Sequence, residues 1–197
     1  MKKPVGVIVA GGQGRRMNGL DKPLAPLAGR TMIAHVAERL APQVDALAIN
    51  ANGDLDRFGL PFPVISDDLP GQPGPLVGIL TAMRWAEAQG ASQVVTMPAD
   101  TPFLPGDVVE RLARGIEINR GSIAVAADES GVHPVAAIWP TIQEATLARA
   151  IEAGLRRVME FTDLHNATIV HFSGEPFFNI NTPDDLAKAQ ARAMRAE

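Results

Sequence analysis

The sequence contains no cysteine and no apolar run near the roughly 18 residues that a membrane-spanning helix requires. The first absence excludes disulfides, zinc–thiolate sites, iron–sulfur clusters and thiol catalysis. Residues 1–4 lead into a strand-length run without a signal-peptide cleavage pattern. We therefore expect a cytoplasmic protein without a membrane partner.

An excess of positive charge is also lacking. The formal net charge is −4, whereas proteins that bind nucleic acid usually carry a basic face or stripe, so we expect no nucleic-acid partner. With 46% hydrophobic and 20% charged residues, the composition is that of an ordinary globular protein. The 197 residues contain no linker-like, repeated or low-complexity segment, which predicts a single domain over residues 1–197.

Apolar runs alternate with helical patterns along the chain. The nearly continuous apolar run at 5–10 predicts a central strand that is covered on both faces. Helical spacing at 31–40 predicts the next element, with Thr31 as its N-cap. Similar signals predict further strands at 44–50, 64–65, 93–98 and 168–172. They predict further helices at 76–83, at 107–114, at 141–162 with a break near Gly154, and from Thr182-Pro183 onward.

Two strands, at 123–127 and 132–139, are separated only by a turn at 128–131, a spacing that helix-linked parallel strands do not show. The sequence therefore predicts a three-layer, Rossmann-like α/β domain whose predominantly parallel sheet is mixed in its second half. In such sheets ligands bind beyond the carboxyl ends of the strands.

The loop after the first strand combines glycines with three cations, Arg15, Arg16 and Lys22. Gly14 and Gly19 have the spacing of a P-loop, but Leu20-Asp21 follow where Lys and Ser or Thr are required, so a P-loop is excluded. The dinucleotide-binding fingerprint is disfavoured, because it places a third glycine where this chain has Met17.

A third kind of phosphate-binding loop remains. Backbone amides at Gly11–Gly14, helped by the three cations, suit the greater negative charge of a nucleoside triphosphate. The alternative is a glycine turn with solvated arginines.

The same loop resembles the LAGG-x-x-x-RMGG-x-DK signature of the nucleotidyltransferase superfamily, and the chain resembles the molybdenum cofactor guanylyltransferase (MobA) family along nearly its whole length. The matching residues are Val9–Gly12, Arg16-Met17, Gly19, Asp21-Lys22, Asn50–Asn52, Asp67, Pro73–Gly78, Pro98–Phe103, His133-Pro134, Arg156–Met159 and Phe178–Pro183. Asn18 replaces the usual glycine, and Asn tolerates a positive φ better than most residues. The resemblance implies a fold of the nucleotide-diphospho-sugar transferase type.

The resemblance also implies a reaction: transfer of GMP from GTP to the terminal phosphate of molybdopterin or Mo-molybdopterin, with release of pyrophosphate. The acceptor phosphate has a second pKa of about 6 and is already a nucleophile near neutrality, so no general base is needed. Mg²⁺ prefers oxygen ligands and often takes only one or two carboxylates, and we expect Asp100, at the carboxyl end of a strand, to bind it. The alternative for Asp100 is a turn or N-cap role.

Further roles follow from the resemblance. The residues expected to take part in catalysis are Arg16, Lys22, Asp100, Asn179 and Asn181, with Arg15 as a further candidate. The residues expected to bind GTP are Val9, Ala10, Gly11, Gly12, Lys22, Asn50, Asp67 and Asp100. Asp67 is expected to accept guanine N–H groups or to make another contact with GTP.

Three of these asparagines have alternatives. Asn50 can instead complete a strand-end turn. Asn179 and Asn181 alternate along an extended stretch, so their side chains should point to one side, either toward ligand or to satisfy the backbone near the last helix.

The amino-terminal half is thus expected to bind nucleotide, and the carboxyl-terminal half the pterin acceptor near His133 and Arg156-Arg157; a core or turn position is the alternative for His133. The expected partners are GTP, molybdopterin or Mo-molybdopterin, and other proteins of molybdenum cofactor biosynthesis and delivery to molybdoenzymes. Cytidylyl transfer to the same cofactor, sugar-1-phosphate nucleotidyl transfer and nucleotide binding without turnover stay open as competing functions.

Overall fold

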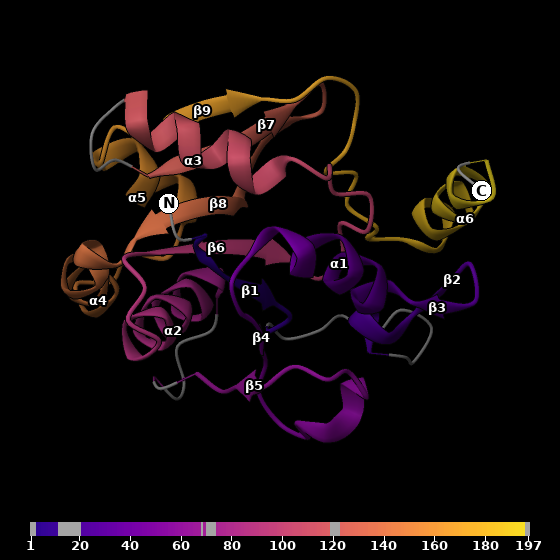
Figure 1. Cartoon of the computed structure of the whole chain (residues 1–197), viewed down its shortest axis with the longest axis horizontal. Coiled ribbons are helices and arrows are strands. Elements are labelled where there is room, and N and C mark those ends of the chain that lie inside the picture. Colours follow the sequence, from indigo (N-terminus) through magenta and orange to yellow (C-terminus); the bar gives the residue numbers. More distant parts are fainter. Residues whose placement is uncertain (1–2, 12–20, 68, 70–73, 119–122, 196–197) are drawn as a thin grey trace.

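A computed structural model of the chain describes residues 3–11, 21–67, 69, 74–118 and 123–195. Seven strands form one sheet in the order β5-β4-β1-β6-β8-β7-β9 (Figure 1). Their bounds are β1 Val5–Val9, β4 Leu47–Asn50, β5 Val64–Ile65, β6 Gln93–Pro98, β7 Ala124–Asp128, β8 Gly131–Pro140 and β9 Thr168–His171. All five residues of β1 are buried, as its continuous apolar run predicted for a central strand.

The sheet is mixed because of one strand. β1 is parallel to both β4 and β6, and β4 is parallel to β5. β8 runs antiparallel to β6 and to β7, and β9 returns parallel to β7. The predicted hairpin is thus confirmed, and its tip lies at the same edge of the sheet as the carboxyl ends of β1, β4 and β6.

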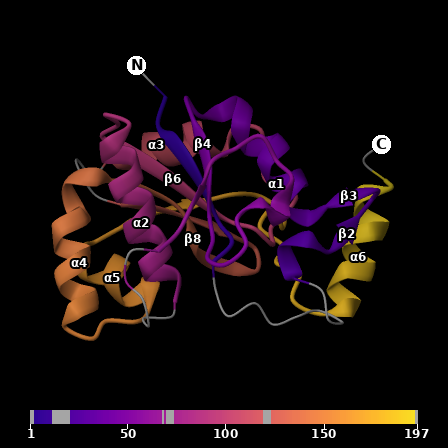
Figure 2. The same cartoon turned by 90° about the horizontal axis from the view of Figure 1, so that it is seen from below.

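Helices cover both faces of the sheet (Figures 1 and 2). The helices are α1 Met32–Leu40, α2 Pro75–Ala88, α3 Val108–Ile118, α4 Glu144–Glu152, α5 Val158–Leu164 and α6 Pro183–Ala193. α1 and α3 pack on one face of the sheet, and α2, α4 and α5 pack on the other, so two apolar cores enclose it. The predicted three-layer α/β architecture is confirmed.

A smaller apolar cluster lies outside these layers. The hairpin of β2 Pro26–Leu27 and β3 Arg30–Thr31 packs against α6 through Leu27 and Ala189, and Met32 at the start of α1 joins the same cluster. Figures 1 and 2 both show α6 beside this hairpin. The sequence did not predict the hairpin, whose turn holds Ala28 at a φ of 44°, a region that alanine rarely occupies.

Several predicted element ends shift. The strand expected at 44–50 starts only at Leu47, because the chain first forms the short 3₁₀ helix η2 (Ala41–Gln43). The helical stretch at 141–162 divides into η4 (Thr141–Gln143), α4 and α5, with Gly154 at a φ of 100° in the break. Thr31 is the N-cap of α1, but its side chain makes no capping hydrogen bond.

The last helix begins as predicted. Thr182 Oγ1 accepts the Asp185 N–H, and the Asp185 carboxylate accepts the Thr182 N–H, which completes a capping box with Pro183 in the first turn. Within the part of the chain that the structure describes, no helix combines the length and the apolarity needed to cross a membrane.

Candidate active site

Lys22 lies at the centre of the candidate site. It opens the 3₁₀ helix η1 (Lys22–Leu24), and its Nζ donates to the Asp100 carboxylate. The same Nζ lies 2.6 Å from Asn181 Oδ1 and 3.3 Å from Asn179 Oδ1. Three oxygens from distant parts of the sequence thus converge on one ammonium group, and we call these four residues the Lys22 cluster.

Backbone contacts hold the cluster at the carboxyl edge of the sheet. Asp100 follows β6, and the preceding Ala99 N–H donates to the carbonyl of Val9 at the end of β1 (3.2 Å). The carbonyl of Asp100 accepts the Ile180 N–H (3.1 Å), which brings the segment with Asn179 and Asn181 alongside. Both amide oxygens reach Lys22, so the two side chains lie on the same side, as their alternation predicted.

The second oxygen of Asp100 has no such partner. Oδ1 is buried and accepts no hydrogen bond from any described residue, although the whole side chain is 18% exposed. A buried carboxylate oxygen without a donor is unfavourable and favours the approach of a cation.

One carboxylate and two amide oxygens also match the ligands that Mg²⁺ prefers. No group of three or more His, Cys, Asp or Glu side chains that could hold a metal occurs among the described residues. A metal at Asp100 would therefore depend on this single carboxylate, amide oxygens, water and ligand phosphates, a ligand set that is common for Mg²⁺.

Asp67 lies in a separate set of hydrogen bonds near the ends of β4 and β5. Its Oδ1 accepts from Asn50 Nδ2 (2.8 Å) and from the Thr81 hydroxyl of α2 (3.2 Å). Its Oδ2 accepts from Asn52 Nδ2 (2.8 Å), and its N–H donates to Asn52 Oδ1 (2.9 Å). A carboxylate has about four lone-pair positions, so these bonds leave one acceptor position on Oδ2.

Asn50 is a buried residue whose side chain donates a hydrogen bond to Asp67. Its side chain is fully buried, its Oδ1 has no partner among the described residues, and its carbonyl accepts the Ala10 N–H (2.9 Å). A Cβ at Gly78 would lie 2.5 Å from that Oδ1, and one at Gly11 would lie 3.1 Å from it. Glycines at these positions let β1 and α2 approach Asn50 closely.

The predicted nucleotide-binding residues are thus only partly brought together. Val9, Ala10, Gly11, Asn50 and Asp67 meet at the ends of β1 and β4, and Lys22 and Asp100 meet beyond β6. Gly12, Arg15 and Arg16 lie outside the described residues, and their roles stay predictions.

His133 belongs to a third cluster, around Asp128 at the tip of the β7–β8 hairpin. His133 Nε2 lies 2.8 Å from Asp128 Oδ1, which also accepts the N–H and hydroxyl of Ser130. Asp128 Oδ2 accepts the Phe177 N–H (3.1 Å). Burial alone would raise the pKa of Asp128, but the hydrogen bonds from His133, Ser130 and Phe177 outweigh it and lower the pKa below its usual value.

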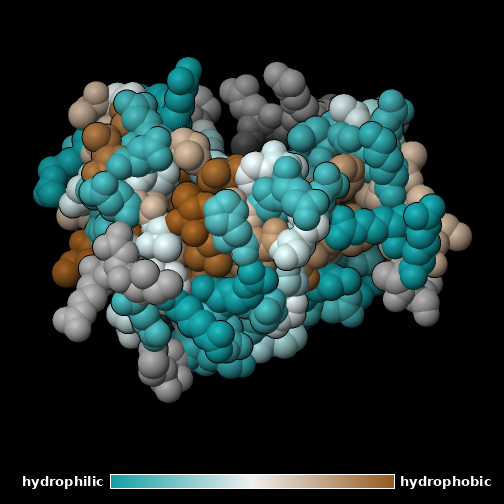
Figure 3. Space-filling model, turned by 90° about the horizontal axis from the view of Figure 1, so that it is seen from above, coloured by the Kyte–Doolittle hydropathy of each residue, from teal (hydrophilic) through white to brown (hydrophobic). Residues whose placement is uncertain are grey.

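The two arginines expected near the acceptor do not join these clusters. Arg156 donates to the carbonyl of Ile151 in the last turn of α4 and to that of Leu155 beyond it (2.8 Å each), which caps the end of that helix. Arg157 lines a shallow pocket along α5 with Met159 and Asp163. Seen from the side of the molecule on which β9 lies, apolar side chains interrupt the polar surface (Figure 3).

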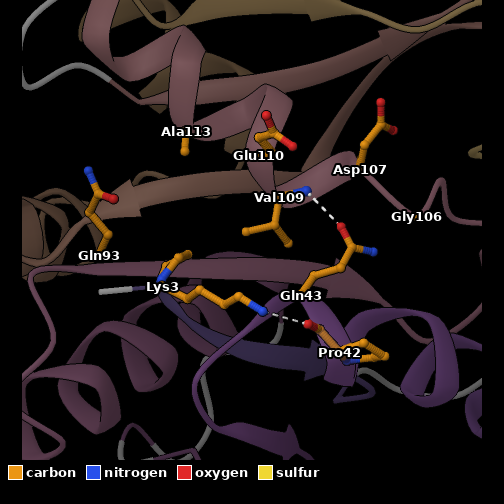
Figure 4. A pocket seen from close by; sticks show the side chains of 10 residues that line it. Lys3, Pro42, Gln43, Gln93, Gly106, Asp107, Val109, Glu110 and Ala113 are labelled. Carbon is orange, nitrogen blue, oxygen red and sulfur yellow. Dashed lines mark hydrogen bonds between the residues drawn. The ribbon is translucent and has the colours of Figure 1, made fainter. Parts of the chain in front are cut away.

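A pocket of about 370 Å³ lies between the end of α1 and the start of α3 (Figure 4). Lys3, which precedes β1, and Gln93, which begins β6, line it, so it lies at the opposite ends of these strands from Asp100. Gln43 accepts the Val109 N–H (3.1 Å) on its border. None of the predicted site residues lines this pocket.

Sequence reasoning assigned no role to Asn52, Thr81, Arg57 or Asp128. Asn50 and Asn52 alternate at the end of a strand as Asn179 and Asn181 do, and this pattern would have indicated that both amides face Asp67. The other three residues take their places through tertiary contacts, for which the sequence gives no local signal.

Comparison with known proteins agrees with this geometry. Residues 6–168 match the family model of the MobA-like NTP transferase domain. A molybdenum cofactor guanylyltransferase of Cereibacter sphaeroides is 48% identical over 188 residues, which cover 94% of this chain and 95% of the relative.

Solved structures share the fold. Molybdopterin-guanine dinucleotide biosynthesis protein A of Archaeoglobus fulgidus superposes with a TM-score of 0.73 at 25% identity, over 97% of this chain and 99% of that protein. CMP:2-keto-3-deoxy-manno-octonic acid synthetase in complex with CTP has a TM-score of 0.73 at 16% identity over the whole of both chains, a likeness in fold alone. The fold is thus of the nucleotide-diphospho-sugar transferase type, and the chain belongs to the MobA-like NTP transferase family.

Proposed function

We propose that this protein transfers GMP from GTP to the terminal phosphate of molybdopterin or Mo-molybdopterin and releases pyrophosphate. The observation that carries the proposal is the convergence of Asp100, Asn179 and Asn181 oxygens on the Lys22 ammonium beyond the carboxyl end of β6. The Cereibacter relative is named a molybdenum cofactor guanylyltransferase, which supports guanylyl transfer in molybdenum cofactor biosynthesis.

The chemistry needs positioned charge rather than a protein nucleophile. A bond forms between an acceptor phosphate oxygen and the α-phosphorus of GTP, and the bond from that phosphorus to the bridging oxygen breaks, so its electron pair leaves with pyrophosphate. The attacking oxygen is ionised near neutrality, and no proton has to be removed from it. Two anions must still approach each other, and Lys22 offsets part of their repulsion.

Asp100, with the amide oxygens of Asn179 and Asn181, fits Mg²⁺ as a bound cofactor. A Mg²⁺ ion held by these residues would offset negative charge on the triphosphate and on the leaving pyrophosphate. Lys22 could exchange its contact with Asp100 for one with the nucleotide phosphates, because its flexible stem carries a point charge that adapts to either partner.

Asp67 is our candidate for reading the base. Guanine presents adjacent N1–H and N2–H donors, and Oδ2 of Asp67 has an acceptor position left. The amides of Asn50 and Asn52 hold the carboxylate in place.

The test is incubation of the purified protein with Mg²⁺, molybdopterin-containing acceptor and either GTP or CTP. We expect pyrophosphate release with GTP, none without Mg²⁺, and little with CTP. Release with CTP in preference to GTP would assign cytidylyl transfer instead. Release with sugar 1-phosphates would assign the sugar reaction, and binding of GTP without turnover would assign a nucleotide-binding regulator.

A further inference from the structure

Arg57 connects two parts of the site that are far apart in the sequence. It lies in the 3₁₀ helix η3 (Asp56–Phe58), in the connection from β4 to β5. Its Nε donates to Asp21 Oδ2 (2.8 Å), on the residue that immediately precedes Lys22. Its Nη1 donates to the carbonyl of Asn52 (3.0 Å), whose side chain holds Asp67.

The guanidinium is fixed on its other side as well. It stacks over the ring of Phe58, with Cζ 4.3 Å from the ring centroid, and Phe58 is 6% exposed and part of the apolar core. An arginine that is held by an aromatic ring, a carboxylate and backbone carbonyls has little freedom, and a lysine cannot reproduce its planar fork of donors.

The contact between Arg57 and Asp21 is also an ion pair. Asp21 stands next to Lys22, where the proposed triphosphate would bind, and an unpaired carboxylate there would repel the substrate. Arg57 compensates that charge, and it fixes the turn from which Lys22 projects, in which the Leu24 N–H donates to the Asp21 carbonyl (2.9 Å).

We propose that Arg57 is a positioning residue that couples the base-reading Asp67 to the phosphate-binding Lys22 through Asn52 and Asp21. This inference rests on the proposed function of the same site. Loss of the coupling changes both the rate of transfer and the choice of base, whereas a merely structural role changes stability alone.

The test compares Arg57→Met, Asp21→Asn and the double variant with wild type. We expect Arg57→Met to lower kcat about tenfold or more and to reduce the preference between GTP and CTP several-fold. The double variant should be no worse than the more affected single variant, because the two residues act as one unit. Arg57→Lys should retain more activity than Arg57→Met, because it keeps the charge.

Arg30→Met is the matched control. Arg30 pairs with Glu38 at 2.6 Å on the exposed surface, outside all three clusters. We expect this variant to keep the wild-type kcat and base preference. Equal losses in Arg30→Met and Arg57→Met, or additive effects of Arg57→Met and Asp21→Asn, would overturn the coupling.

Amide hydrogen exchange provides a readout that does not depend on activity. Arg57→Met should accelerate exchange at Leu24, Ala25 and Asp67, whose N–H groups bond within the connected turns, and Arg30→Met should not. Unchanged exchange at these amides overturns the inference. A wild-type protein that transfers no nucleotide would contradict the proposed function, and the exchange measurement would then still show whether Arg57 holds the two turns together.

Discussion

Asp100 and Asp128 both lie at the carboxyl edge of the sheet, but their carboxylate oxygens differ in the hydrogen bonds that they accept. Asp128 is fully buried, and its two oxygens accept hydrogen bonds from Ser130, His133 and Phe177. Asp100 has one oxygen on Lys22 and another that accepts nothing from the described residues. A buried carboxylate whose oxygens both accept hydrogen bonds stabilises the fold, whereas one with an oxygen that accepts none can bind a cation there.

The largest effect is expected from substitution of Asp100. Asp100→Asn keeps the shape of the side chain but removes the charge proposed to bind Mg²⁺. We expect pyrophosphate release to fall on the order of 1,000-fold, with a free energy of unfolding within about 1 kcal/mol of wild type. Activity assays and urea denaturation measure the two quantities, and near-wild-type turnover would remove Asp100 from the metal site.

Lys22→Met should have the next largest effect. It removes the cation proposed to neutralise the nucleotide phosphates, and it leaves Asp100, Asn179 and Asn181 facing an apolar side chain. We expect kcat/KM for GTP to fall on the order of 100-fold. Lys3→Met, which removes an exposed cation bonded to the Pro42 carbonyl, is the control and should be silent.

Asp128→Asn should affect stability more than turnover per folded molecule. The variant loses charge-assisted hydrogen bonds in a buried cluster, and we expect the free energy of unfolding to fall by about 1–3 kcal/mol. A larger loss of activity than of stability would show that the distinction between the two carboxylates is wrong.

The difference in stability between wild type and Asp128→Asn should also depend on pH. The folded-state pKa of Asp128 is lowered, so its stabilisation is present above the unfolded-state value of about 3.9 and is lost as the pH falls through the folded-state pKa. The difference in unfolding free energy between wild type and Asp128→Asn should therefore begin to shrink near the unfolded-state pKa of about 3.9 and continue to shrink as the pH falls through the lowered folded-state pKa. A difference that grows toward acid would contradict the lowered pKa.

The smallest effect is expected at Thr182. This residue follows the segment 177–181, which contacts Asp128 through Phe177 and Lys22 through Asn181. Thr182→Ala removes the hydroxyl that caps α6, immediately after Asn181. We expect a loss of about 1 kcal/mol in thermal or urea unfolding and a kcat within about twofold of wild type. Thr146→Ala is the control. The half-buried Thr146 of α4 accepts a long hydrogen bond from Arg149 (3.3 Å), and its replacement should leave both quantities unchanged.

The sequence predicted those features that depend on local pattern. The continuous apolar run at Val5–Val9 indicated a buried central strand, the short turn after Asp128 indicated a hairpin, and Thr182-Pro183 indicated the start of α6. Each of these signals lies within a few residues and reflects one preference of the backbone.

Features that depend on long-range packing were not predicted. The bond from Arg57 to Asp21 joins residues that are 36 positions apart. Asp128 has the sequence signal of an exposed turn, yet it is buried because Phe177 and His133 pack over it. The β2–β3 hairpin requires a positive φ at Ala28, which no local preference indicates.

The reversed direction of β8 has a consequence for how such a protein can diversify. The tip of its hairpin with β7 is the two-residue turn Glu129-Ser130. The Glu129 N–H donates a hydrogen bond to the Gly174 carbonyl (3.2 Å). Insertions at this tip would extend the edge of the sheet at which Asp100 also lies, while the register of β1, β4 and β6 stays as it is. If the proposed function holds, a longer turn here would alter the acceptor side of the site without changing the strands expected to carry the nucleotide site.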